Sequence, residues 1–129
     1  MKRILFDSSV IIAILRSERG YQNGEKHVDR GAISTVNWAE VSGFLGRNNA
    51  PKDIIQQTLA KYPLKVLPYE EDLVVPTGHL AAGRQHLGLS LGERACLATA
   101  IKYQLPVLTA DRVWKKLETE LGLDIQLIR

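Results

Sequence analysis

The amino-acid sequence predicts an α/β fold in which a short central parallel sheet is flanked by helices on both faces. Short apolar runs alternate with segments of helical periodicity along the whole chain, which is the order expected of parallel strands joined by helices. The 129 residues are 45% hydrophobic and 24% charged, which is ordinary for a globular domain and sufficient for one core. No repeat or linker interrupts them, so we expect a single domain over residues 1–129.

The first half of the chain is expected to supply two strands and four helices. The apolar run 3–6 ends at Asp7 and predicts a strand, whereas the longer apolar segment 8–16 predicts a helix. Pro51 suits the first turn of a helix, because a proline has no amide hydrogen to satisfy there. The remaining expected elements are a helix at 24–30 within the polar stretch 17–31, a strand at 32–35, and helices at 36–47 and 51–62.

The second half repeats the same alternation. A strand at 65–69 is stopped by Pro68, and Pro76 disturbs the first half of the segment that follows. The expected elements after that strand are a helix at 70–87, a helix at 91–103, a strand at 105–111, a helix at 111–121 and a last strand at 124–129.

Charge and cysteine content narrow the class of partner and the compartment. The net charge is +3, with 17 Lys and Arg against 14 Asp and Glu, which favours polyanionic partners such as nucleic acid. Cys96 is the single cysteine, so one chain can form neither a disulfide nor a zinc framework, and we expect a reducing cytoplasm. No stretch approaches the roughly 20 apolar residues needed to span a membrane, so no membrane partner is expected.

Two aspartates are expected at one edge of the predicted sheet. Asp7 ends the first strand, and Asp111 ends the strand at 105–111. Because sites in open α/β sheets lie beyond the carboxyl ends of the strands, both carboxylates should lie at the same edge. Each aspartate also opens a helix and has a purely structural interpretation as an N-cap.

A glutamate inside a helix is harder to explain structurally. Glu40 has apolar residues at i−4 and i+4, Val36 and Phe44, and therefore lies at the margin of the buried side of its helix. A carboxylate is costly there unless it binds a cation or forms an ion pair. Arg94 and Arg112 are the candidates for such an ion pair.

Glu93 has two interpretations. The pattern Ser90-x-x-Glu93 is a capping box, which satisfies free amides at the start of a helix. The residues at i+3, i+4 and i+7 from Glu93 are apolar or small, so its side of the helix faces the sheet edge. The same carboxylate is therefore a candidate metal ligand.

Convergence of these four acids would place four negative charges in one cleft. Like charges at close range resist joint ionisation, and a hard divalent cation relieves that repulsion. Carboxylate oxygens suit Mg²⁺ or Mn²⁺, which lower the pKa of bound water and neutralise charge on a phosphodiester. An acidic metal pocket in a basic protein favours hydrolysis of a polyanion.

Four segments then occur in an order that resembles a known family. LFDSSVIIAIL, ISTVNWAEV, GLSLGERACLATA and LPVLTADRVW resemble the PIN-domain ribonucleases, specifically the VapC-type toxins of bacterial or archaeal toxin–antitoxin pairs. The similarity runs from Lys2 to the terminal DIQLIR. It implies a compact sheet between helices, Mg²⁺- or Mn²⁺-dependent endonucleolytic cleavage of RNA, a homodimer, and inhibition by a cognate antitoxin whose tail covers the acidic pocket.

The resemblance also implies the roles of individual residues. Ser8 and Thr109 fit positions whose hydroxyls orient a carboxylate or a bound water, and Arg94 and Arg112 would touch phosphate or pair with a carboxylate. The family's four catalytic and metal-binding acids fall on Asp7, Glu40, Glu93 and Asp111.

One of these positions departs from the family pattern. The third acid is usually aspartate, and Glu93 is one methylene longer, although Mg²⁺ demands near-ideal octahedral geometry. The departure predicts a shifted ion or a water-mediated contact, with lower activity or a preference for Mn²⁺.

The sequence therefore predicts a cytoplasmic endoribonuclease, the toxin of a toxin–antitoxin pair, which hydrolyses RNA with a metal-activated water. The alternative is a catalytically degenerate PIN module that binds RNA or antitoxin without cutting, and only Glu93 supports it. Dinucleotide and P-loop sites are disfavoured because neither glycine-rich motif is present. A phosphatase that uses Asp7 as its nucleophile is also disfavoured, because Glu40 would then have no role.

Overall fold

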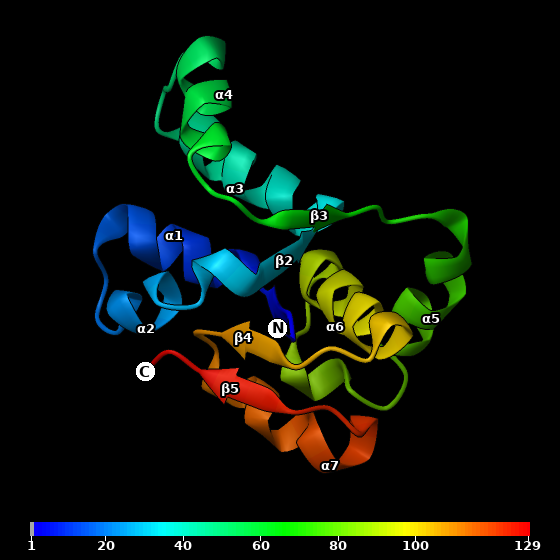
Figure 1. Ribbon diagram of the computed structural model, residues 1–129. Helices are drawn as coiled ribbons and strands as arrows, with labels where there is room; N and C mark the ends of the chain where they lie inside the picture. The colour runs from blue at the N-terminus through cyan, green and yellow to red at the C-terminus, as the bar shows by residue number, and fades with distance from the viewer. Residues whose placement is uncertain (1) are drawn as a thin grey trace.

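Within residues 2–129, which the computed structural model describes, five short strands form one all-parallel sheet (Figure 1). The order across the sheet is β3-β2-β1-β4-β5. The central strands are completely buried, because helices cover both faces of the sheet. The predicted fold class is confirmed. The strands are β1 (Ile4–Phe6), β2 (Gly31–Ser34), β3 (Lys65–Leu67), β4 (Val107–Thr109) and β5 (Ile125–Leu127).

The alternation of side chains along β1 divides the core into two layers. Ile4 and Phe6 point to one face and pack with Val10 of α1, whereas Leu5 points to the other face and packs with Leu97 of α6. Figure 1 accordingly shows α1 and α2 on one side of the sheet and α5 and α6 on the other. The helices are α1 (Ser8–Arg16), α2 (Tyr21–Glu25), α3 (Thr35–Arg47), α4 (Lys52–Ala60), α5 (Val74–His79), α6 (Leu91–Tyr103) and α7 (Glu118–Leu121).

Helices α3 and α4 form a hairpin that projects from the body of the molecule (Figure 1). No residue of α4 is fully buried. The hairpin is joined to the segment that follows by an edge-to-face contact between Trp38 and Tyr62, whose ring centroids are 6.2 Å apart.

The predicted helix at 24–30 is wrong in position. The structure instead has α2 at Tyr21–Glu25 and a separate 3₁₀ turn at Val28–Arg30. The reason is a close approach between helices, because a Cβ atom at Gly24 would lie 2.7 Å from Cγ1 of Val10. Glycine at this position lets α2 pack directly on α1.

The predicted helix at 70–87 is broken into three pieces. A 3₁₀ turn at Glu71–Leu73 leads into the six-residue α5, and a second 3₁₀ turn follows at Gln85–Leu87. Pro76 falls in the first turn of α5, where it is tolerated. Gly83 and Gly88 adopt positive φ angles of 72° and 63°, which end the helical stretches.

The predicted helix at 111–121 begins as a 3₁₀ helix at Arg112–Leu117 and continues as the short α7. The other predicted strands and helices are found, with ends that differ by no more than two residues. No helix of residues 2–129 is both long and apolar enough to cross a bilayer.

Candidate active site

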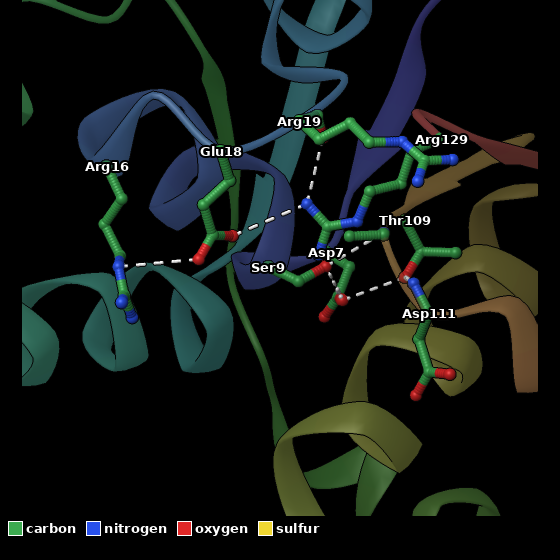
Figure 2. A network of polar contacts seen from close by, with 9 residues as sticks. Asp7, Ser9, Arg16, Glu18, Arg19, Thr109, Asp111 and Arg129 are labelled. Carbon is green, nitrogen blue, oxygen red and sulfur yellow. Dashed lines mark hydrogen bonds and ion pairs between the residues drawn. The ribbon is translucent and has the colours of Figure 1, made fainter.

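Two aspartates meet at the carboxyl edge of the sheet, as the sequence predicts. Asp7 directly follows β1 and Asp111 follows β4, and these strands are paired neighbours. Thr109 joins the two acids, because its hydroxyl donates to Oδ2 of Asp7 at 3.1 Å and accepts from the backbone amide of Asp111 at 3.1 Å. Figure 2 shows the three residues side by side.

Asp7 is a buried carboxylate that does not cap a helix. Its side chain is 4% exposed, and α1 has no side-chain hydrogen bond from its N-cap, so the capping interpretation of Asp7 is wrong. Instead Oδ2 accepts from the hydroxyl of Ser9 at 2.6 Å and from Thr109. The pKa of Asp7 is raised to about 6, mainly because the carboxyl group is buried. Hydrogen bonds from the two hydroxyls oppose this increase, and the negative charges of Glu40 and Glu93 add to it.

Asp111 does act as a helix cap. Its Oδ1 accepts from the backbone amide of Val113 at 3.0 Å, at the start of the 3₁₀ helix. Within residues 2–129 its Oδ2 accepts no hydrogen bond. The structural interpretation of Asp111 is therefore correct, and one oxygen is still available for another role.

Glu40 is held by neutral donors and not by an arginine. Oε1 accepts from the hydroxyl of Ser8 at 3.0 Å and from the side-chain amide of Asn37 at 2.8 Å. The alternative of an ion pair between Glu40 and Arg94 is wrong, because that guanidinium donates to the backbone carbonyls of Thr77 and Leu89. Ser8 therefore orients a carboxylate, as expected, whereas Arg94 ties the loop before α6 to that helix.

Arg112 is exposed, and within residues 2–129 it forms neither an ion pair nor a side-chain hydrogen bond. The alternative in which Arg112 pairs with a site acid is therefore not observed in that part of the chain. Arg112 directly follows Asp111 in the sequence, so an exposed guanidinium group lies beside this acid.

Helices α3 and α6 meet at the carboxylate of Glu40. The buried amide of Asn37 donates a second hydrogen bond, at 2.9 Å, to the carbonyl of Gly92 in the first turn of α6. A Cβ atom at Gly92 would lie 2.1 Å from Oε2 of Glu40, so only glycine lets the carboxylate occupy this space. Within the described residues, Oδ1 of Asn37 has no partner, which leaves one buried acceptor for a water or ligand.

Glu93 closes the capping box that the sequence pattern suggests. Its Oε1 accepts from the backbone amide of Ser90 at 3.0 Å, and the Ser90 hydroxyl accepts from the Glu93 amide at 3.2 Å. Its Oε2 accepts from the indole Nε1 of Trp114 at 3.0 Å. Both oxygens of the carboxylate are therefore engaged by donors.

The acids form one region of uncompensated negative charge. Asp7 lies close enough to Glu40 and Glu93 for their negative charges to raise its pKa. The pKa of the Cys96 thiol is raised mainly by burial, and the charges of the same three acids raise it as well. None of the ion pairs within residues 2–129 involves these acids or Asp111. Figure 2 shows two of those ion pairs, from Glu18 to Arg16 and to Arg129, which do not reach Asp7.

The donor chemistry of this region fits a hard divalent cation bound in an open site. Within residues 2–129, no group of three or more His, Cys, Asp or Glu side chains is arranged so that it could hold a metal ion together. Asp7 Oδ1, Glu40 Oε2 and Asp111 Oδ2 are carboxylate oxygens that accept no hydrogen bond within those residues. Such a set fits Mg²⁺, which keeps several waters and takes only one or two carboxylates together with substrate phosphates.

A cavity of about 410 Å³ lies at the opposite edge of the sheet and contains none of the four acids. Its lining includes Lys2, Pro106 and Asp124, which precede strands β1, β4 and β5. The acidic region is therefore distinct from this cavity.

Sequence reasoning missed four of the residues that hold the acids. Asn37 lies three residues before Glu40 on the same helical face, and Ser9 lies two residues after Asp7, so their spacing was informative. Gly92 and Trp114 had no such signal, because they approach Glu40 and Glu93 from other elements.

The model of the PIN domain family matches residues 4–120. A toxin–antitoxin complex from Klebsiella pneumoniae has 22% sequence identity and a TM-score of 0.66, over 86% of this chain and 89% of that chain. The DNA-bound VapBC from Salmonella typhimurium has 18% identity and a TM-score of 0.75 over 100% of both chains. VapBC-5 from Mycobacterium tuberculosis has 24% identity and a TM-score of 0.63, over 100% of this chain and 99% of that chain. No curated protein matches the sequence.

At these identities the solved structures show a shared fold. The family model goes further, because its match extends from β1 to α7 and includes all four acids. The family named from the sequence motifs is thereby confirmed. The chain belongs to the PIN domain family.

Proposed function

We propose that this chain is a metal-dependent endoribonuclease whose acidic site consists of Asp7, Glu40, Glu93 and Asp111. The observation that carries the proposal is the uncompensated negative charge at the carboxyl edge of a PIN-family sheet, where burial and neighbouring carboxylates raise the pKa of Asp7. A protein keeps such a costly arrangement where a cation or a reaction requires it. The net charge of +3 supports a polyanionic substrate.

Each proposed ligand is oriented by this chain's own donors. Ser9 and Thr109 hold one oxygen of Asp7, and Ser8 and Asn37 hold one oxygen of Glu40. One or two of the free oxygens of Asp7, Glu40 and Asp111, together with waters and substrate phosphate, would hold Mg²⁺ or Mn²⁺. When bound, that cation would activate a water for hydrolysis and offset the charge that develops on the phosphodiester.

We also propose that the chain is the toxin of a toxin–antitoxin pair, with a cognate antitoxin as partner and a homodimer as its assembly. Its similarity in fold to the VapBC structures, including full coverage of the Salmonella typhimurium chain, supports this role. The antitoxin would cover the acidic edge of the sheet.

The test is cleavage of mixed RNA by the purified chain with Mg²⁺ or Mn²⁺, compared with excess chelator. We expect cutting with either metal, loss of cutting with chelator, and loss in Asp7→Asn and Glu40→Gln. Asp124→Asn is the matched control, because Asp124 is an exposed aspartate at the opposite edge of the sheet. Cutting that survives both chelator and Asp7→Asn would show that the proposed mechanism is wrong.

A PIN module that binds RNA or antitoxin without cutting is the second candidate. The engagement of both Glu93 oxygens by donors favours it, because a fourth free carboxylate is then missing. RNA binding without cleavage at any concentration of either metal would support this candidate.

A further inference from the structure

The carboxylate of Glu93 joins two parts of the structure. Its Oε1 accepts from the backbone amide of Ser90 at the start of α6, and its Oε2 accepts from the indole of Trp114 in the 3₁₀ helix Arg112–Leu117. The first element contains Gly92, against which Glu40 packs, and the second is capped by Asp111. Glu93 therefore links the elements that position two other acids.

If cation binding required Glu93 to move, both links would break. Trp114 is completely buried, and a buried indole N–H that loses its acceptor carries the full cost of its desolvation. The amide of Ser90 would lose its side-chain acceptor at the same time. A hydrogen bond from an N–H group to an ionised carboxylate is also stronger than one between neutral groups.

The other three acids are placed differently. In Asp7 and Glu40 the observed hydrogen bonds converge on one oxygen, and in Asp111 a single bond engages Oδ1. Within residues 2–129 each of these carboxylates thus has one oxygen that accepts no hydrogen bond. Glu93 is the member of the set whose two oxygens are both engaged.

We propose that Glu93 is a positioning residue and not a direct cation ligand, and that Trp114 holds it in this role. Glu93 contributes negative charge to the site and links α6 to the 3₁₀ helix, while the direct ligands of the divalent cation come from Asp7, Glu40 and Asp111. The ligand assignment depends on the proposed function, whereas the link between Glu93 and Trp114 does not.

The first experiment measures binding of Mn²⁺ alone to the full chain by titration calorimetry. Glu93→Gln keeps a capping acceptor for Ser90 but removes the charge, so we expect it to bind Mn²⁺ about tenfold more weakly, as for an outer-shell partner. Asp7→Asn and Asp111→Asn should lose far more affinity, and Asp124→Asn should lose none. If Glu93→Gln melts cooperatively but loses Mn²⁺ binding as completely as Asp7→Asn, Glu93 is a ligand and the proposal is overturned.

A second variant tests the role of the indole. Trp114→Phe removes the donor but retains the charge of Glu93, so we expect a lower melting temperature and a loss of Mn²⁺ affinity smaller than that of Glu93→Gln. Tighter Mn²⁺ binding in this variant would show that Trp114 restrains a true ligand, and would overturn the proposal.

The third measurement is independent of any cation. In a Trp38→Phe background Trp114 is the remaining tryptophan, and we expect Glu93→Gln to shift its emission maximum, because the indole loses a charged acceptor. An unchanged emission and melting temperature would refute the link. A wild-type chain that binds no Mn²⁺ would contradict the proposed function. The emission and melting temperature of Glu93→Gln would still show whether Glu93 and Trp114 are linked.

Discussion

At the scale of single residues, the buried carboxylate of Asp7 is costly to keep ionised. The carboxylate is 4% exposed, has two hydroxyl donors and no ion-pair partner within residues 2–129, and has two further negative charges nearby. Its pKa of about 6 means that the folded chain without cation binds a proton here more readily than the unfolded chain does.

The first prediction concerns the pH dependence of stability without cation. Because the pKa of Asp7 is about 6 in the folded state and 3.8 in its ordinary environment, stability should fall as pH rises from about 4 to about 7. The loss should approach about 3 kcal/mol, at 1.36 kcal/mol per pH unit of difference. Asp7→Asn lacks this titration, so in chelator it should be more stable than wild type at pH 7.5 but not at pH 4, as measured by urea unfolding.

The matched control is Asp124→Asn, whose exposed carboxylate should give no such difference between the two pH values. If Asp7→Asn changes stability equally at pH 4 and pH 7.5, burial of Asp7 is not the cause.

The second prediction concerns stabilisation by a cation. A ligand that binds only the folded chain stabilises it by about 2.7 kcal/mol at a concentration 100 times its Kd. Mg²⁺ or Mn²⁺ should therefore raise the melting temperature of wild type at pH 7.5 and leave that of Asp7→Asn nearly unchanged. Melting temperatures are measured by differential scanning fluorimetry. If the cation stabilises wild type and Asp7→Asn equally, it binds at a site that does not include Asp7.

At the scale of elements, the contact between α3 and α6 decides where the carboxylate of Glu40 lies. Asn37 connects the two helices by donating to both Glu40 and the carbonyl of Gly92, and Gly92 provides the space. This arrangement depends on a glycine in the first turn of a helix, where glycine is otherwise unfavourable.

The third prediction tests this contact with two glycine substitutions. Gly92→Ala should abolish cleavage and weaken Mn²⁺ binding, because the new methyl group would displace the carboxylate of Glu40. Gly46→Ala is the matched control in α3, since nothing lies within 4 Å of a Cβ atom there. The control should keep full activity and gain up to about 1 kcal/mol of stability from helix propensity. Full activity of Gly92→Ala would contradict the role of this contact.

At the scale of the whole molecule, the two edges of the sheet differ in the side chains that they present. The carboxyl edge gathers the four acids and the exposed Arg112, whereas the cavity at the opposite edge is lined partly by leucines and a proline. The chain as a whole has a net charge of +3, whereas this edge carries four carboxylates. A polyanion attracted by the whole molecule would need a cation to approach the acids.

The fourth prediction concerns binding of RNA by the Asp7→Asn variant, in which cleavage is absent. Affinity should fall with salt, and Arg112→Ala should reduce the slope of log K against log salt by about 0.7, the value for one phosphate contact with a single strand. Lys102→Ala is the control, because Lys102 lies in the last turn of α6, whereas Glu93 lies in its first turn, and because Lys102 pairs with Asp72. An unchanged slope in Arg112→Ala, measured by filter binding, would exclude a phosphate contact there.

The sequence by itself determined the alternation of strands and helices, the parallel sheet, and the placement of Asp7 and Asp111 at its carboxyl edge. It also showed the capping box at Ser90 and Glu93. These features follow from the local periodicity of apolar residues, which short stretches of sequence record. They also follow from the shared direction of parallel strands, which brings their carboxyl ends to one edge.

Only the tertiary structure decided which donors hold each carboxylate. Ser8 reaches Glu40 across 32 positions of sequence, and Trp114 reaches Glu93 across 21. Such contacts depend on how separate elements pack, and no short-range pattern records that packing. The same reason explains the misplaced helix at 24–30, since its true position follows from the approach of α1 to Gly24.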